Sequence, residues 1–130
     1  MTQSLEDYLE MVSFLADEGE VRVTDIAVRL KVSKPSVLTA LRILEQQGYL
    51  DHERYRAVRL TPAGVVRARE IRDRHSLLTV FLQDVVGVNP EIAEKDACKM
   101  EHLLSDETLK KIKTLVKAKK KNAKREISSV

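Results

Sequence analysis

Aromatic side chains are scarce in this chain of 130 residues: they make up 4% of it, and Trp is absent. This scarcity argues against a large aromatic pocket for an organic cofactor and against a base-stacking platform for single-stranded nucleic acid. No apolar run approaches the roughly 18 residues that a membrane-spanning helix needs. The first four residues also lack the basic and apolar regions of a signal peptide. We therefore expect a cytoplasmic protein with no organic cofactor and no membrane partner.

Cysteine is nearly absent too. The single Cys98 cannot form an internal disulfide, which agrees with a reducing compartment. Net charge is +3 but unevenly distributed: from Lys110 onward there are nine Lys or Arg and one acid, so this tail carries +8 and the first 109 residues carry −5. We expect the tail to be solvated, and contact with nucleic acid is the alternative.

Apolar residues at helical spacing predict a mainly α-helical protein. Ser4 is the expected N-cap of a first helix, which should end near Ala16, and Thr24 is the expected N-cap of a second. After a tight turn, Pro35 fits the first turn of a third helix, where its missing N–H is not needed. Helix, short turn and helix together predict a helix-turn-helix.

A β-hairpin with a charged tip should follow, because two short apolar stretches at 49–50 and 58–60 flank a polar segment. Such a hairpin is the wing of a winged helix-turn-helix. Pro62 then opens a long helix, expected to run for about 24 residues, or about 36 Å. Asn89 and Ser105 begin two further helices.

These elements predict two domains. Residues 1–72 should form a winged helix-turn-helix DNA-binding domain, and residues 73–130 an α-helical metal-binding and dimerisation domain with a basic C-terminal tail. Apolar residues late in the long helix are the candidate dimer interface, and the alternative is that they only close the monomer core. They are Leu77, Leu78, Val80 and Phe81.

DNA binding is indicated by the order of the elements. In a winged helix-turn-helix the second helix of the pair enters the major groove and the wing reaches the backbone. The residues expected there are small, polar or basic, as close approach to DNA requires. They are Ser33, Lys34, Pro35, Ser36, Thr39 and Arg42 on the helix, and Arg54 and Arg56 at the wing tip. Taken singly, each is more often part of a solvated helix face.

A metal site is indicated by Cys98, Glu101 and His102, whose spacing of i, i+3 and i+4 places them on one face of a helix. All three are residue types that bind transition metals. Further metal-capable residues are Asp7 with Glu10, close together on the first helix, and His75. Each of these patches alone would have an ordinary structural explanation; the cluster of three different ligand types is more specific.

Several motifs together carry a family resemblance. They are Glu6-Asp7-Tyr8-Leu9-Glu10, Val32-Ser33-Lys34-Pro35-Ser36-Val37, Glu53-Arg54-Tyr55-Arg56, Leu60-Thr61-Pro62-Ala63-Gly64, Arg74-His75, and the run from Ala97 to Ser105. With these motifs the chain resembles the diphtheria toxin repressor family, in particular its manganese transport regulator branch, over nearly its whole length.

The resemblance implies a homodimeric, metal-activated repressor of metal-uptake genes that binds palindromic, double-stranded operator DNA and is not an enzyme. It implies as metal ligands Asp7, Glu10, His75, Cys98, Glu101 and His102, with Glu94 as a weaker candidate. Thr79 replaces an acidic ligand of the iron-sensing branch, which counts against an iron-type second site. The SH3-like third domain of that branch is expected to be absent.

The ligand types leave the metal open between Mn²⁺ and Fe²⁺. Asp7 and Glu10 offer hard oxygen ligands suited to Mn²⁺, whereas the thiolate of Cys98 favours softer ions. Co²⁺, Zn²⁺ or Cd²⁺ are expected to substitute in vitro. As co-repressor, the metal should select the arrangement of the two halves that fits DNA.

Two other classes of function remain open from sequence. A winged-helix dimer responding to a small molecule would leave the converging ligand patches unexplained. A small metal-dependent hydrolase would leave the winged helix without a role, and the sequence has no Gly-rich loop to form a substrate pocket. A protein that only buffers metal fails for the same reason as the hydrolase.

Overall fold

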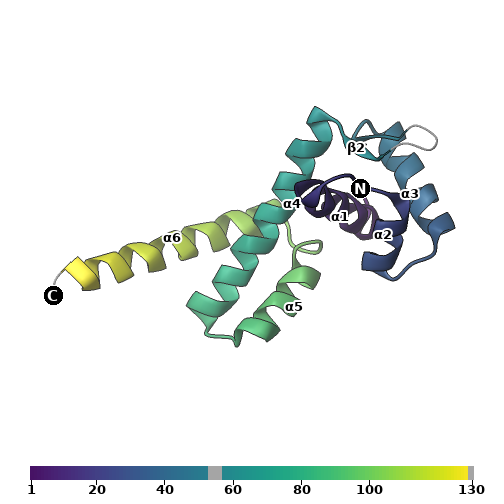
Figure 1. Cartoon of the computed structure of the whole chain (residues 1–130). Helices are drawn as coiled ribbons and strands as arrows, with labels where there is room; N and C mark the ends of the chain where they lie inside the picture. The colour runs from purple at the N-terminus through teal and green to yellow at the C-terminus, as the bar shows by residue number, and fades with distance from the viewer. Residues whose placement is uncertain (53–56, 129–130) are drawn as a thin grey trace. The chain divides into compact units, whose positions relative to one another are not determined.

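The computed structural model describes residues 1–52 and 57–128, with the side chains of the last helix described up to residue 124 (Figure 1). The chain divides into two compact units, Met1–Ile71 and Arg72–Val130. The first unit holds three helices and a small β-hairpin, and the second holds the remaining helices. The long helix α4, Pro62–Val80, contributes residues to both.

Helix α1, Gln3–Glu18, begins two residues earlier than Ser4 would allow as a cap. Thr2 is the N-cap: its backbone is extended and its Oγ1 accepts a hydrogen bond from the Leu5 N–H at 3.2 Å. Thr and Ser are both good N-caps, so residue type alone could not distinguish Thr2 from Ser4 as the start of the helix. The helix ends at Gly19, whose φ of 149° favours glycine.

Helices α2, Val23–Leu30, and α3, Lys34–Gln46, form the helix-turn-helix. The expectation that Thr24 caps α2 is wrong, because the helix starts before it and its N-cap, Arg22, makes no side-chain cap. Ser33 caps α3 by accepting the Ser36 N–H at 3.3 Å, and Pro35 lies in the first turn as expected.

The wing consists of β1, Leu50–Asp51, and β2, Arg59–Leu60, paired antiparallel with Leu50 opposite Leu60. One further bridge joins Val58 to Val21, the residue that precedes the turn into α2. The hairpin is therefore tied to the segment between α1 and α2.

The core of the first unit joins all of these elements. Among its fully buried side chains are Leu9, Val12, Ile26, Leu41, Leu44 and Ile71. Ile71 comes from α4, so the first half of that helix completes this core. The start of α4 is fixed by Thr61, whose hydroxyl donates to the Gly48 carbonyl at 2.6 Å and accepts the Gly64 N–H at 3.1 Å.

In the second unit the helical run that starts at Pro62 continues from α4 into a π-helical segment, η1, Phe81–Val86. Gly87 ends it with a φ of 86°. Helices α5, Pro90–Met100, and α6, Asp106–Ser128, follow. They pack against the end of α4 and η1 through a second core (Figure 1), formed by Leu78, Leu82, Ala93, Ala97, Leu109, Ile112 and Val116. No helix within the described ranges is long and apolar enough to span a membrane.

Candidate metal centre and DNA-binding surface

Glu101 is the most buried polar residue of the second unit, with 0% of its surface exposed. It is the C-cap of α5 and still has helical φ and ψ angles of −58° and −26°, because its N–H donates to the Ala97 carbonyl at 3.0 Å. The carboxylate is thereby directed at α4, where its Oε2 lies 3.0 Å from Nδ1 of His75.

His75 is held between two carboxylates. Its Nδ1 pairs with Glu101, and its Nε2 lies 2.7 Å from Oε1 of Glu94. Both ring nitrogens can donate to an acceptor only in the imidazolium form. The hydrogen bond to Glu101, with a smaller contribution from Glu94, raises the pKa of His75 to about 9, against the opposing effect of burial.

Cys98 completes a group of three donors. One ligand atom each from His75, Cys98 and Glu101 lie within 4.8 Å of one another. Ligand atoms about 2.0–2.3 Å from a common ion have separations of this order. The donor set of nitrogen, sulfur and oxygen is typical of a transition-metal site. Glu94 lies beside it through its contact with His75.

His102 lies differently from what the spacing predicted. Helix α5 ends at Met100, so His102 is part of the following turn and not of the helical face that carries Cys98. Its side chain is 1% exposed, and its Nε2 lies 3.2 Å from Oε1 of Glu101. This oxygen is buried and has no hydrogen bond of good geometry to any described residue. A buried carboxylate oxygen beside an imidazole nitrogen fits a bound cation.

Two other predicted ligands come from the first unit. Asp7 and Glu10 lie on α1 in the first unit, both half-buried. The Thr79 hydroxyl donates to the His75 carbonyl at 2.9 Å, so this side chain is hydrogen-bonded to the backbone of its own helix.

The sequence did not predict the burial of Glu6, whose carboxylate lies 3.7 Å from the guanidinium of Arg67. An acid in the first turn of a helix is normally exposed to solvent.

The predicted DNA-contacting residues of α3 are all exposed: Ser33, Lys34, Pro35, Ser36, Thr39 and Arg42. The opposite face of this helix packs into the core through Val37, Ala40, Leu41 and Leu44. The Thr39 hydroxyl donates to the Pro35 carbonyl at 3.0 Å, so it is hydrogen-bonded to the backbone of its own helix. Arg54 and Arg56 lie outside the described residues.

The candidate dimer residues divide into two kinds. Leu78 is fully buried in the core of the second unit, so it offers no surface to a second copy, and here the alternative of a core residue holds. Leu77, Val80 and Phe81 are half-buried and pack against that core. The more exposed large apolar side chains of this unit are Val85, Val86, Ile92, Leu103 and Leu115.

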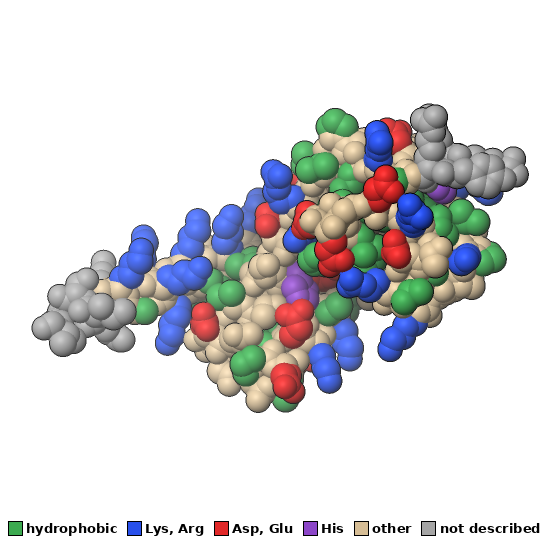
Figure 2. Space-filling model, in the orientation of Figure 1, with side chains coloured by type: hydrophobic (Ala, Val, Ile, Leu, Met, Phe, Trp, Pro, Cys, Tyr) green, Lys and Arg blue, Asp and Glu red, His purple; other side chains and the backbone are tan. Residues whose placement is uncertain are grey.

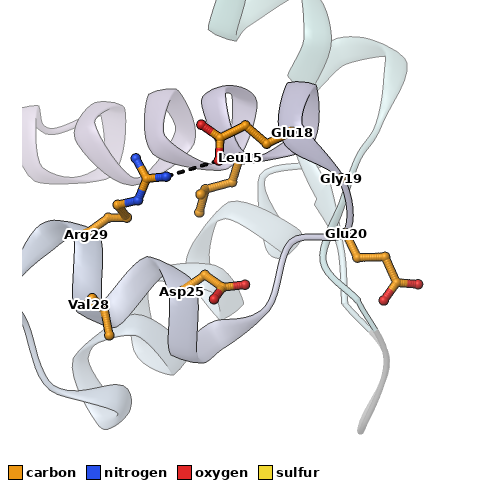
Figure 3. A pocket seen from close by; sticks show the side chains of 7 residues that line it. All are labelled: Leu15, Glu18, Gly19, Glu20, Asp25, Val28 and Arg29. Carbon is orange, nitrogen blue, oxygen red and sulfur yellow. Dashed lines mark hydrogen bonds and ion pairs between the residues drawn. The ribbon is translucent and has the colours of Figure 1, made fainter.

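A hollow of about 330 Å³ lies in the first unit between the end of α1 and α2 (Figure 3). Three acids line it, and Arg29 pairs with one of them, Glu18, at 3.0 Å. Leu15 and Val28 are its apolar side chains. Sites for organic ligands are mostly apolar, so this charged hollow gives the small-molecule alternative little support.

Comparison with known families agrees with both units. Residues 1–58 match the N-terminal DNA-binding domain of the iron-dependent repressors, and residues 61–126 match their metal-binding and dimerisation domain. The chain belongs to the iron-dependent repressor family, whose members are metal-dependent transcriptional regulators.

Individual relatives are transcriptional regulators. The transcriptional regulator MntR of Salmonella typhimurium is 46% identical over 106 residues, which cover 81% of this chain and 67% of the relative. MntR of Lysinibacillus sphaericus is 38% identical over 122 residues, covering 93% and 87%. An uncharacterized HTH-type regulator of Methanocaldococcus jannaschii is 35% identical over 115 residues, covering 87% and 92%.

Solved structures show the same fold. A manganese-dependent transcriptional repressor in complex with manganese superposes with a TM-score of 0.77 at 30% identity. The match covers 86% of this chain and 52% of that one, so the chain spans about half the length of this repressor. The repressor ScaR with bound Cd²⁺ matches with a TM-score of 0.77 at 26% identity, over 87% of this chain and 53% of that one. The predicted family and the mainly helical fold with a winged helix-turn-helix are thereby confirmed, and residues 61–126 match a metal-binding domain as predicted.

Proposed function

We propose that this chain is a repressor that binds palindromic operator DNA as a homodimer, with Mn²⁺ or Fe²⁺ as co-repressor, and controls metal-uptake genes. The observation that carries the proposal is the buried Glu101 between the imidazoles of His75 and His102. One oxygen of this carboxylate pairs with His75, whereas the other is buried without a hydrogen bond to any of the described residues, and a bound cation would satisfy it.

The residues proposed to hold the metal are those of the second unit, His75, Cys98, Glu101 and His102, together with Asp7 and Glu10 of α1; Glu94 remains a weaker candidate. A bound divalent cation supplies positive charge among these carboxylates. The support for Asp7 and Glu10 is their hard oxygen chemistry and the motif they share with the family. Because they belong to the first unit, their participation would couple metal binding to the DNA-binding half.

On the DNA side, α3 is proposed to enter the major groove with its exposed face, and the wing to approach the backbone. The homodimer would place two such helices at a separation set by the groove, about 34–36 Å or a multiple. A repressor acts where its DNA is, so we place the protein in the cytoplasm. The proposal involves no catalysed reaction.

The first test is fluorescence anisotropy on palindromic DNA from upstream of the protein's own gene or a neighbouring metal-transporter gene, at fixed salt. Titrations with chelator, Mn²⁺, anaerobic Fe²⁺, Co²⁺ and Zn²⁺ should give tight binding only with metal. The ranking of the ions at cellular concentrations then decides between Mn²⁺ and Fe²⁺. Equal binding with chelator would overturn the metal requirement and favour the small-molecule alternative.

His102→Ala should abolish metal-stimulated DNA binding, because it removes a proposed ligand beside Glu101 Oε1. The dimer, measured by analytical ultracentrifugation, should stay intact. The matched control is Asp96→Asn, an exposed acid on α5 outside the proposed ligand set, which should retain both properties. Loss of the dimer in His102→Ala, or unchanged stimulation by metal, would contradict the assignment.

A further inference from the structure

The second half of α6 extends beyond the core of the second unit. Val116 is its last buried side chain within the described range, and every residue from 117 to 124 is exposed. Figure 2 shows Lys and Arg side chains along this helix. The sequence predicted a solvated basic tail; the structure orders it as a helix, which gives its charges a fixed arrangement.

Six exposed lysines of α6 share one face, which we call the lysine stripe: Lys110, Lys113, Lys117, Lys120, Lys121 and Lys124. Their steps of three and four residues place them within an arc of about 100°, at 3.6 residues per turn. The stripe is about 21 Å long at 1.5 Å per residue. Lys111 and Lys119 are also exposed, but the same geometry places them outside the arc.

The stripe is electrostatically unfavourable on its own. Like charges at i, i+3 and i+4 destabilise a helix, and beyond Val116 no buried residue through position 124 offsets this repulsion. The sequence has no acid between residues 108 and 124. Within the described part of the chain, no stripe lysine takes part in an ion pair. A partner with regularly spaced negative charges would relieve the repulsion.

Duplex DNA has the matching chemistry, with one negative charge per about 1.7 Å of its axis. A membrane surface matches less well, because interfacial helices need large apolar residues opposite their basic face. From Lys117 to Lys124 the residues between the lysines are Ala118, Asn122 and Ala123.

We propose that the lysine stripe is a second DNA-contacting surface, which binds phosphates of the duplex without regard to base sequence. The inference rests on the proposed function, since it takes DNA as the partner. The stripe adds affinity and salt dependence, whereas base recognition stays with α3.

The test is the salt dependence of DNA binding by the full chain with Mn²⁺, on operator DNA and on an unrelated duplex. The variant Lys120→Gln with Lys124→Gln removes two stripe charges. The matched control, Lys111→Gln with Lys119→Gln, removes two charges from the same helix outside the stripe. Each phosphate contact contributes about 0.9 to the slope of log affinity against log salt, so the stripe variant should lose about 1.8 for each helix that touches DNA.

This change corresponds to a roughly 12-fold smaller loss of affinity between 50 and 200 mM salt. It should be the same on both duplexes and absent in the control. Lys120→Arg with Lys124→Arg, which keeps the charge, should retain the wild-type slope and so separates charge from helix structure.

An unchanged slope in the stripe variant overturns the proposal, as does an equal decrease in the control, which would indicate net charge alone. Weaker binding to vesicles of anionic phosphatidylglycerol with an unchanged DNA slope would assign the stripe to membranes instead, and also overturns it. Failure of the proposed function is distinguishable, because it would appear as equal operator binding by wild type with Mn²⁺ and with chelator. The slope on the unrelated duplex tests the stripe in either case.

Discussion

A single carboxylate links the donors of the second unit. Glu101 faces His75 with one oxygen and His102 with the other, at 3.0 and 3.2 Å. A buried carboxylate needs a positive partner, and the protonated His75 provides one. As they stand, these residues form an ion pair through Oε2 of Glu101 and leave its Oε1 without a hydrogen bond within the described part of the chain; they would become ligands when a cation replaces the proton. Metal binding and proton release are therefore linked.

Metal binding should release a proton from His75. With a pKa of about 9 in the folded protein and an ordinary value of 6.5, His75 is protonated in the folded metal-free protein at pH 7.5. Its ion pair contributes stability that is fully present below pH 6.5 and is lost as the pH rises through about 9. Because a ligating imidazole must be neutral, the apparent affinity for metal should rise with pH up to about 9.

Calorimetric titration with Mn²⁺ at pH 7.5, in buffers of different ionisation enthalpy, counts these protons. A coordinating thiol also loses its proton, so wild type should release about two protons per metal and Cys98→Ser about one. If Cys98→Ser released no proton on binding metal, His75 would not be a ligand that is protonated in the metal-free protein.

The residue types of Cys98 and Glu101, together with the family resemblance for His75, indicated most of this cluster. Cys98, Glu101 and His75 are of ligand type, and the structure brings their donor atoms within 4.8 Å of one another. The burial of Glu101 was not predictable, because an acid near a helix end is normally exposed. The contact of Glu94 with His75 depends on packing between α4 and α5, which helical periodicity does not specify; only the family resemblance suggested it.

At the scale of elements, periodicity identified the helices but not their ends. Pro35, Pro62 and Asn89 were reliable starts, since each has a local effect on a helix N-terminus. The π-helical turns of η1, Phe81–Val86, gave no signal in the sequence, because their residues are ordinary helix residues. No Gly or Pro marks the end of α5 at Met100. The sequence therefore did not predict that His102 lies in the turn after the helix.

One glycine fixes the contact between α4 and the wing. A Cβ at Gly64 would overlap with the Tyr49 carbonyl oxygen and lie 2.9 Å from its carbonyl carbon. The obstacle is backbone, which cannot move aside as a side chain can. Gly64→Ala should therefore destabilise the first unit by about 1–3 kcal/mol, the range for overpacking, measured by urea unfolding of the metal-free protein.

The control is Ala63→Ser, which adds one atom at the neighbouring exposed position of the same turn. It should change stability by no more than about 0.5 kcal/mol. Equal losses in the two variants would mean that α4 and the wing are not in close contact at Gly64.

At the scale of the whole molecule, two separate cores share one helix. Leu9, Ile26 and Leu44 belong to the first, Leu78 and Ala97 to the second, and α4 passes through both units. The boundary between the two units follows Ile71. The assignment of DNA binding to residues 1–72 and of metal binding and dimerisation to residues 73–130 stays a prediction. The helical spacing of apolar residues locates the cores. Whether donors of the first unit join those of the second is a long-range property that local spacing does not contain.

Metal should couple the unfolding of the two units if its ligands come from both. Scanning calorimetry of the metal-free protein should then show two transitions, one for each core. Mn²⁺ at about 100 times its Kd adds about 2.7 kcal/mol to whatever structure binds it. If Asp7 and Glu10 are ligands, both transitions of the wild type should rise and merge, because the first unit is then part of the binding structure.

Removing these two carboxylates tests the coupling directly. In Asp7→Asn with Glu10→Gln, metal should raise only the transition of the second unit, since His75, Cys98, Glu101 and His102 remain. The matched control, Glu20→Gln with Asp25→Asn, removes two other carboxylates of the first unit and should behave as wild type with metal. If the variant without Asp7 and Glu10 still shows merged transitions, the first unit contributes no ligand through α1. Metal would then have to act on DNA binding through the dimer alone, because no donor from the DNA-binding half would sense its presence.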